Sequence, residues 1–593
     1  SNAAFQDALN LIQYTRQSVF LTGKAGTGKS TFLRYVCENT KKKHVVLAPT
    51  GIAAINAGGS TMHSFFKLPF YPLLPDDPNL SLQRGRIHEF FKYTKPHRKL
   101  LEQIELVIID EISMVRADII DAIDRILRVY SHNLREPFGG KQLLLVGDVF
   151  QLEPVVKNDE REILNRFYPT PYFFSARVFG QIDLVSIELQ KVYRQTDPVF
   201  VGVLDHIRNN TAGAADLQLL NTRYGSQIEE SEADMYITLA TRRDTVDSIN
   251  EKKLAELPGD PITFEGVIEG DFPESSLPTS QELVLKPGAQ IIFIKNDFDR
   301  RWVNGTIGVI AGIDEEEETI YVITDNGKEC DVKRESWRNI RYRYNEKTKE
   351  IEEEVLGSFT QYPIRLAWAI TVHKSQGLTF SRVVIDFTGG VFAGGQAYVA
   401  LSRCTSLDGI QLKKPINRAD VFVRPEIVNF AGRFNDRQAI DKALKQAQAD
   451  VQYAAASRAF DKGDMEECLE QFFRAIHSRY DIEKPVPRRF IRRKLGVINT
   501  LKEQNKKLKE QMREQQERLR QYAHEYLLMG NECITQAHDS RAALANYDKA
   551  LSLDPNYVDA WIRKGITLFN NKEYFDAENC FNIAVTLYPA NFK

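Results

Sequence analysis

The sequence lacks long apolar runs, clustered cysteines and a strong net charge, and each absence excludes a class of protein. No uninterrupted apolar stretch approaches the roughly 20 residues that a membrane-spanning helix needs. The six cysteines are scattered along 593 residues, without the paired spacing typical of a metal site or a disulfide framework. The formal net charge is only −2, so binding to nucleic acid would need a local basic surface. We therefore expect a soluble, cytoplasmic protein that does not bind a membrane. A bacterial cytoplasm or nucleoid is the expected location.

The chain is too long for a single hydrophobic core, and its apolar pattern divides it into several parts. Short apolar runs such as Val45 to Leu47 and Leu106 to Ile109 are each followed by a helical pattern. This alternation is typical of buried strands in a parallel sheet. We predict a first α/β domain over residues 4–183, with an insertion at about 67–99, and a second α/β domain over residues 184–440.

Residues 288–362 break this rhythm with short alternating strands, acidic turns and an Asn326-Gly327 hairpin signal. We predict a small β-rich, SH3-like insertion in the second domain. Within it, basic and aromatic side chains alternate from Arg338 to Tyr344. That pattern fits a solvated strand face or a contact with nucleic acid, and the sequence leaves both open.

Residues 441–593 form a predicted all-helical tail, in which the charged, Gln-rich stretch from Leu501 to Arg520 indicates one long exposed helix. The last part, 522–593, carries an internal repeat. Ala543, Tyr547, Ala550 and Pro555 precede Ala577, Phe581, Ala584 and Pro589 by 34 positions, the period of tetratricopeptide repeats. An unrelated helical bundle is the alternative.

Two repeats cannot bury their apolar faces alone. We therefore expect a neighbouring helix to complete them, either a degenerate copy near Phe472 or the long charged helix. Trp561, Gly565 and Phe581 should be structural residues of the repeats.

A glycine-rich loop follows the first apolar run and opens a helix, which is the setting of a phosphate-binding P-loop. Its backbone amides can surround the phosphates of ATP or GTP, Lys29 supplies positive charge, and the Ser30 hydroxyl can ligate Mg²⁺. An ordinary glycine-rich turn is the bland alternative. The predicted ATP-binding residues of the loop are Gly23, Ala25, Gly26, Thr27, Gly28, Lys29, Ser30 and Thr31.

A second apolar strand ends in two acids, Asp110 and Glu111. Beside a P-loop, Asp110 is the predicted second Mg²⁺ ligand, and Glu111 would orient and deprotonate the attacking water. A strand that finishes in a solvated acidic turn would have the same residues without the chemistry. These two motifs together predict binding of a nucleotide and its hydrolysis.

Six ordered motifs resemble those of superfamily 1 DNA helicases, most closely the petite integration frequency (Pif) family and its RecD-like relatives. The resemblance covers about residues 5 to 412. It is carried by Ala48-Pro49-Thr50-Gly51 with Gly59 to Phe66, Asp110 to Val115, Gly147 to Leu152, Val192 to Gln195, Thr371 to Gly377 and Tyr398 to Arg403. It implies two RecA-like P-loop NTPase domains.

The resemblance also implies roles for single residues. Gln6 would read adenine, and Gln376 with Gly377 would contact the nucleotide from the second domain. Gln151 would link the γ-phosphate to the DNA groove. Arg194 and Arg403 would bring positive charge to the γ-phosphate, which a cleft between two domains needs in order to sense hydrolysis. The implied single-strand contacts are Thr50, His63, Phe65, His373 and Lys374.

We therefore predict an ATP-dependent and Mg²⁺-dependent DNA helicase that moves 5′ to 3′ on single-stranded DNA and unwinds tailed duplex. We expect a monomer whose repeats bind a protein partner. The alternative is an ATP-dependent switch or scaffold that binds DNA and recruits a partner without processive unwinding.

Overall fold

The computed structural model describes residues 3–24, 27–83, 85–151, 153–190, 197–225, 235–391, 395–478 and 485–592. Its contacts divide the chain into two compact units, Ser1–Ala475 and Ile476–Lys593. Among the described residues, no helix combines the length and the apolar character that crossing a bilayer requires.

A six-stranded parallel sheet forms the centre of the first α/β domain, with the order β3-β2-β4-β5-β1-β6. Alternate residues of its strands enter two separate cores, so Phe20 and Val107 lie on one face while Leu21 and Ile108 lie on the other. Burial on both faces explains the continuous apolar runs. The strands are β1 Val19–Gly23, β2 His44–Ala48, β3 Ser60–Thr61, β4 Leu106–Ile109, β5 Gln142–Val146 and β6 Val185–Leu189.

Helices cover both faces of this sheet. Helix α1 packs with α2 on one face, where Phe5 meets Phe32 edge-on with ring centroids 5.0 Å apart, and α7 contributes to the core of the other face. The helices of this domain are α1 Ala3–Tyr14, α2 Lys29–Asn39, α3 Gly51–Ala57, α4 Met62–Phe66, α5 Arg86–Phe91, α6 Lys95–Gln103, α7 Ala117–Tyr130 and α8 Asn158–Leu164.

Strand β6 corrects one predicted boundary. Residues from 184 onward were assigned to the second domain, but Val185 to Leu189 pair in parallel with β1 and close the edge of the first sheet. A short apolar run indicates a strand and does not indicate which sheet receives it.

The second α/β domain is built on a four-stranded parallel sheet of order β18-β7-β19-β20. Its strands are β7 Ile237–Ala240, β18 Ala369–Thr371, β19 Val383–Asp386 and β20 Ile410–Leu412, and its helices include α9 Pro198–Arg208, α10 Ala214–Asn221, α11 Arg243–Glu256 and α12 Gln396–Leu401. Two parallel sheets with flanking helices make the fold that of two RecA-like domains.

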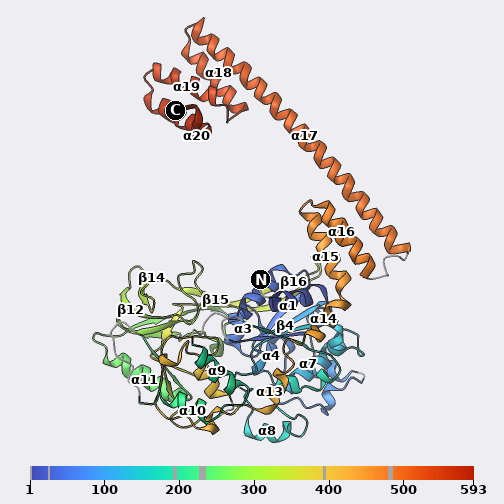
Figure 1. Ribbon diagram of the computed structural model, residues 1–593. Coiled ribbons are helices and arrows are strands. Elements are labelled where there is room, and N and C mark those ends of the chain that lie inside the picture. Colours follow the sequence, from blue (N-terminus) through green and yellow to red (C-terminus); the bar gives the residue numbers. More distant parts are fainter. Residues whose placement is uncertain are drawn as a thin grey trace. The chain divides into compact units, whose positions relative to one another are not determined.

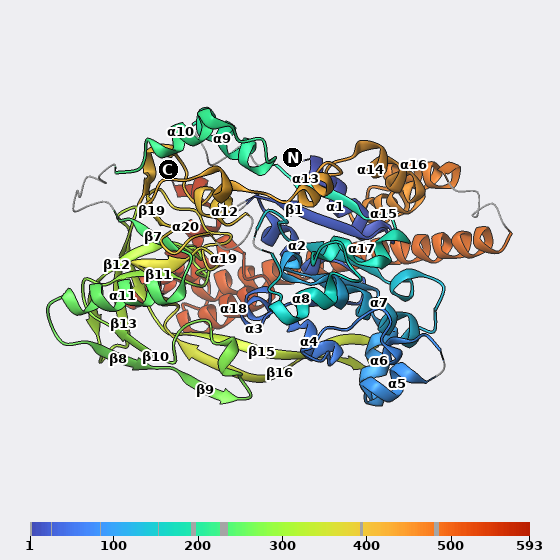
Figure 2. The same ribbon diagram turned by 90° about the horizontal axis from the view of Figure 1, so that it is seen from below.

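A β-rich insertion separates β7 from β18. Its antiparallel strands run from Ile262 to Leu366 and thus begin earlier than the predicted residue 288. They are β8 Ile262–Glu265, β9 Val267–Gly270, β10 Glu282–Leu285, β11 Gln290–Phe293, β12 Ile307–Asp314, β13 Thr319–Thr324, β14 Glu329–Val332, β15 Glu335–Asn345, β16 Glu350–Gln361 and β17 Ile364–Leu366. The long β15–β16 hairpin reaches the first domain, where β15 contacts α6 (Figure 2).

Four helices follow β20 and belong at least in part to the first unit: α13 Pro425–Ala431, α14 Arg437–Gln446, α15 Gln448–Asp461 and α16 Met465–Ser478. The predicted tail began at residue 441, yet the compact units divide only after Ala475. The reason is that α14 packs against α1, where Arg437 pairs with Asp7 at 2.6 Å and Ala443 enters the core.

The second unit consists of helices, as predicted: α17 Pro485–Thr535, α18 Ser540–Leu553, α19 Val558–Asn570 and α20 Tyr574–Leu587. Figure 1 shows α17 as one uninterrupted helix. Its C-terminal end completes the first helix pair, since Ala523 and Leu527 pack with Tyr547 of α18. In the second pair a side chain at Gly565 would meet the Phe581 ring at 2.7 Å, so the glycine permits close packing of α19 on α20.

Candidate functional site

The P-loop lies between β1 and α2, where the backbone leaves the sheet and turns into the helix. Gly28 has a φ of 101°, in the region that favours glycine. Gly23 is packed so tightly that an added Cβ would lie 2.9 Å from the Leu189 carbonyl. Lys29, half-buried, donates hydrogen bonds to the carbonyls of Gly23 and Lys24. Gly23 and Gly28 thus have glycine-specific geometry at the two ends of the loop, while Ala25 and Gly26 lie outside the described residues.

Two acids face this loop from the end of β4. The Asp110 carboxylate accepts a hydrogen bond from the Glu111 backbone N–H at 2.9 Å, and Glu111 has a φ of 52°, an uncommon conformation for a non-glycine residue. Burial and the neighbouring Asp110 raise the pKa of Glu111 to about 7. Burial also raises the pKa of Asp110. Both carboxylates therefore lie in a place where negative charge lacks full compensation.

Asp148, just after β5, is a member of this cluster that the sequence reading did not single out. It is buried, and its charge acts on Lys29, Glu111 and Arg403. Gln151 is buried three residues later, where its backbone N–H donates to the Asp148 carbonyl at 3.1 Å. The signal was present in the sequence, because Asp148 follows an apolar strand in the same way as Asp110 does.

Arg403 brings positive charge from the second domain and is only 3% exposed. Its guanidinium donates to the carbonyls of Val399 and Leu378 and to the Ser402 hydroxyl, at 3.0, 3.2 and 3.1 Å. None of these partners carries a charge, and burial lowers the pKa of Arg403. The structure thus holds this cation rigidly within the electrostatic reach of Lys29 and Asp148. Arg194, the other predicted arginine, lies outside the described residues.

The remaining nucleotide-contact predictions lie at the edges of this cluster. Gln376 has a buried Nε2 with no hydrogen-bond partner among the described residues, and Gly377 has a φ of 78°. Ser30 and Asp110 line one cavity, and Thr31 is exposed beside Ser30 at the start of α2. Gln6 is exposed on α1 and bonds Asn10 at 3.0 Å.

The predicted single-strand contacts of the first domain differ in exposure. Thr50 is exposed and caps α3 by accepting from the Ala53 N–H at 3.2 Å. Phe65, in contrast, is only 3% exposed, so its ring offers no free face to a base in this structure. Phe70, which the sequence reading passed over, is 85% exposed and stacks on His63 with ring centroids 5.2 Å apart. The ring of this segment that is open to solvent is therefore that of Phe70, which His63 covers on one side.

In the second domain, His373 and Lys374 are exposed after β18, as a contact with DNA would require. Arg365 lies near Lys374, and its Nε has no hydrogen-bond partner among the described residues. Burial alone lowers the pKa of Arg365. Lys374 also lies in the fields of Arg243 and Asp247. Cations close together are suited to a phosphate group, so Arg365 is a further candidate beside the residues found from the sequence.

The basic and aromatic side chains of β15 are already engaged. Arg338, Arg341 and Arg343 each pair with a glutamate of β16, at 3.8, 2.7 and 3.5 Å. The Tyr342 hydroxyl accepts a hydrogen bond from the Val46 N–H of β2 at 3.1 Å. These contacts favour the first of the two interpretations, a solvated strand face that packs on the first domain. They disfavour a surface that is free to bind nucleic acid.

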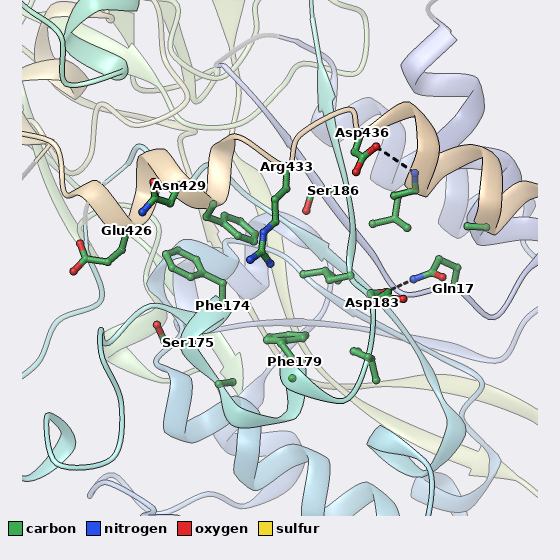
Figure 3. Close-up of a pocket in the computed structure, with 18 of the residues that line it drawn as sticks. Gln17, Phe174, Ser175, Phe179, Asp183, Ser186, Glu426, Asn429, Arg433 and Asp436 are labelled. Atoms are coloured by element: carbon green, nitrogen blue, oxygen red, sulfur yellow. Dashed lines mark hydrogen bonds between the residues drawn. The ribbon is translucent and has the colours of Figure 1, made fainter.

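A cavity of about 790 Å³ lies elsewhere, between the segment before β6 and helices α13 and α14 (Figure 3). Phe174 stacks on Phe430 with ring centroids 4.4 Å apart at its edge, and Arg433 reaches into it. None of the predicted site residues that the structure describes lines this cavity. It is therefore separate from the cluster around the P-loop.

Comparisons with known proteins agree with this geometry. A profile described as PIF1-like helicase matches residues 2–206, and one described as tetratricopeptide repeat matches residues 546–579. The chain is 34% identical to the ATP-dependent DNA helicase Pif1 of Campylobacter jejuni over an alignment of 414 residues, and the match covers 67% of this chain and 88% of that protein.

Two solved structures are similar as well. Bacteroides sp Pif1 in complex with ADP-AlF4 is 42% identical, with a TM-score of 0.66 over 72% of this chain and 96% of that chain. Pif1 helicase from Bacteroides in complex with ADP-AlF3 and ssDNA is also 42% identical, with a TM-score of 0.50 over the same shares of 72% and 96%.

Proposed function

The chain belongs to the family of PIF1-like helicases and is an ATP-dependent DNA helicase, and from this premise we propose that it moves 5′ to 3′ along single-stranded DNA and unwinds tailed duplex. The observation that carries the proposal is the group of charges at the domain cleft. Lys29 lies in the fields of Asp110, Glu111 and Asp148 and of Arg403 from the second domain, and no salt bridge among the described residues joins these groups. Such a cluster is completed by a charged ligand, here the phosphates of ATP.

Hydrolysis is proposed to use Glu111 as the base. A carboxylate whose pKa is raised to about 7 takes a proton from water more readily than an ordinary glutamate does. Asp110 and Ser30 fit Mg²⁺, because both residues line one cavity and Mg²⁺ is commonly held by one or two protein oxygens with phosphates and water. Bound Mg²⁺ would supply positive charge to the phosphates.

Coupling to DNA is proposed to run through two groups of residues, one in each domain. Thr50, His63 and Phe70 would hold the strand on the first domain, and Lys374 with Arg365 would hold it on the second. The single-stranded DNA in the similar Bacteroides structure supports this class of ligand. Because Arg403 and Lys374 belong to the same domain, closure on ATP would shift the strand contacts.

The tail is proposed to bind a peptide from another protein, as its match to tetratricopeptide repeats supports. Trp561 would keep a structural role, since its Nε1 donates to the Pro555 carbonyl at 2.8 Å. Capture of the same protein by the intact chain, but not by a chain ending after Ala475, would test this role.

Strand displacement from 5′-tailed and 3′-tailed duplexes, measured side by side with ATP and Mg²⁺, tests the motor. We expect displacement from the 5′-tailed duplex and ATP turnover that rises strongly with single-stranded DNA. A Glu111→Gln enzyme is the matched control for turnover. Displacement from the 3′-tailed duplex alone would overturn the polarity. DNA-stimulated turnover without displacement from either duplex would favour the switch or scaffold.

A further inference from the structure

The first part of α17 has few packing contacts, among the described residues, with the other helices of its own unit. Helix α17 has 51 residues, which at roughly 1.5 Å per residue is about 76 Å. Among its described side chains, those that enter the core with α18 begin at Ala523. Residues 499–518 are all exposed. Yet this exposed stretch is not uniformly polar.

Its apolar side chains form one narrow seam. Between residues 498 and 522 they fall only on the a and d positions of one heptad register, whose spacings alternate between three and four, and the polar Asn505 and Gln515 occupy its two other positions. The seam consists of Ile498, Leu501, Asn505, Leu508, Met512, Gln515, Leu519 and Tyr522. Every other residue in this stretch is polar or charged. A helix that lies on a globular core has a wider apolar face, whereas an a/d seam is the pattern of a coiled coil.

The seam is open to solvent in the single chain. Leu501, Leu508 and Met512 are 58%, 57% and 69% exposed. Three large apolar side chains in line, about one helical turn or two apart, cost free energy in water unless another surface covers them. Solvated charges on the rest of the helix, such as the Arg513–Glu517 pair, do not remove that cost.

We propose that this seam pairs with the same seam of a second copy, so that the protein forms a dimer through a parallel two-stranded coiled coil over Ile498 to Tyr522. The choice of partner rests on Asn505. An asparagine at an a position is satisfied when it meets its own copy across a parallel dimer, and it then fixes register and the number of strands. Against an unrelated apolar groove, its amide would be buried without a partner.

The flanking charges agree with the parallel arrangement. Lys502 and Lys509 occupy e positions, and Gln504 and Gln511 occupy g positions. In a parallel pair, e positions of one strand face g positions of the other, so each lysine avoids another lysine. In an antiparallel pair, e faces e, and the lysines would be brought together. About three and a half heptads with two polar seam residues should give a dimer that dissociates on dilution.

Such a dimer would place a second motor unit at high local concentration, because the coiled coil lies between the motor and the repeats in the sequence. The proposed dimer differs from the monomer expected from the sequence, because the seam provides an interface between two copies. The proposal does not depend on the polarity or on the substrate of the helicase.

Sedimentation velocity of the full chain over a wide concentration range tests it. We expect a reversible monomer–dimer equilibrium. A Leu501→Glu, Leu508→Glu double variant should stay monomeric throughout, with helix content and ATP turnover unchanged, since both side chains are exposed in the single chain. Lys506→Glu, on the opposite side of the same turns, is the matched control and should dimerise like the unaltered chain. A full chain that is monomeric at every concentration, or a dimer that survives the double variant, overturns the proposal.

Direction is tested by oxidative cross-linking. Leu501→Cys should give a disulfide-linked dimer, because a parallel in-register pair places this position opposite its own copy. Lys506→Cys, off the seam, is the control for random collision and for the native cysteines. Cross-linking of both variants to the same extent contradicts the parallel seam, and so does the absence of cross-linking in Leu501→Cys at concentrations where the dimer sediments.

Discussion

The nucleotide cleft and the β15–β16 hairpin both contain many charged side chains, but the partners of these side chains differ. In the cleft, Lys29 and Arg403 are held by backbone carbonyls and hydroxyl groups, and the nearby carboxylates are not hydrogen-bonded to them. On the hairpin, Arg341 pairs with Glu354 at 2.7 Å and both side chains remain in water. The first arrangement leaves charge available, while the second neutralises it.

A charged side chain that is held by neutral groups is available to a ligand, whereas one in an ion pair is not. A cation fixed in low dielectric by neutral partners keeps its full field for whatever enters the cleft. An exposed ion pair contributes little to stability and offers little to a ligand, because salt and water already screen it. Substitutions in the two regions should therefore differ by orders of magnitude in effect.

The largest effect is expected for Arg403→Ala. Loss of this guanidinium removes positive charge from the cleft when the transition state develops, and ATP turnover should fall on the order of 10³-fold. Arg403→Lys should not restore turnover, because an ammonium cannot reach the same set of acceptors. Rapid-mixing ATPase assays and nucleotide binding by fluorescence check this. Normal turnover with weakened nucleotide binding would place Arg403 in binding instead of hydrolysis.

Lys29→Ala should reduce turnover on the order of 10²- to 10³-fold, since the phosphates lose their nearest cation. Lys99→Ala, which removes an exposed lysine that pairs with Glu102 at 3.6 Å, is the control and should leave turnover unchanged. Steady-state ATPase rates at saturating DNA give both numbers. If the two variants lose activity equally, the field of Lys29 is not what the cleft uses.

Glu111→Gln should slow turnover on the order of 10²-fold while ATP still binds, because the amide keeps the shape of the side chain and loses the proton acceptor. Equilibrium binding of ATP, measured beside single-turnover hydrolysis, separates a loss of binding from a loss of hydrolysis. Near-normal hydrolysis would show that another group activates the water.

The cleft could be read from the sequence because its parts are local. A P-loop needs its glycines and Lys29 within a few residues, and Asp110 and Glu111 follow directly on an apolar strand. Pairings between distant residues were not readable. The ion pair of Arg341 depends on the register that sets it opposite Glu354, and the placement of β6 depends on its pairing with β1.

Aromatic residues show the same limit. Phe65 and Phe70 lie five positions apart, and only packing decides that the first is buried and the second exposed. No periodicity in so short a segment separates a ring that fills a core from one that faces a strand of DNA. Arg365 was missed for a related reason, because a single arginine in a strand carries no motif until its lack of a partner is seen.

The smallest effect is expected for Arg341→Ala. This variant tests whether the paired charges of the hairpin are unavailable to DNA. If the pair with Glu354 is only a solvated strand contact, neither Tm nor the affinity for single-stranded DNA should change measurably. The Arg341→Ala, Glu354→Ala double variant should behave like either single one. Binding isotherms at several salt concentrations decide the matter, since a lysine or arginine that contacts a phosphate contributes about one unit to the slope of log affinity against log salt. A slope that falls by about that much in Arg341→Ala would mean that DNA displaces Glu354 from its partner, and the hairpin would then belong to the strand-binding surface despite its neutralised charges.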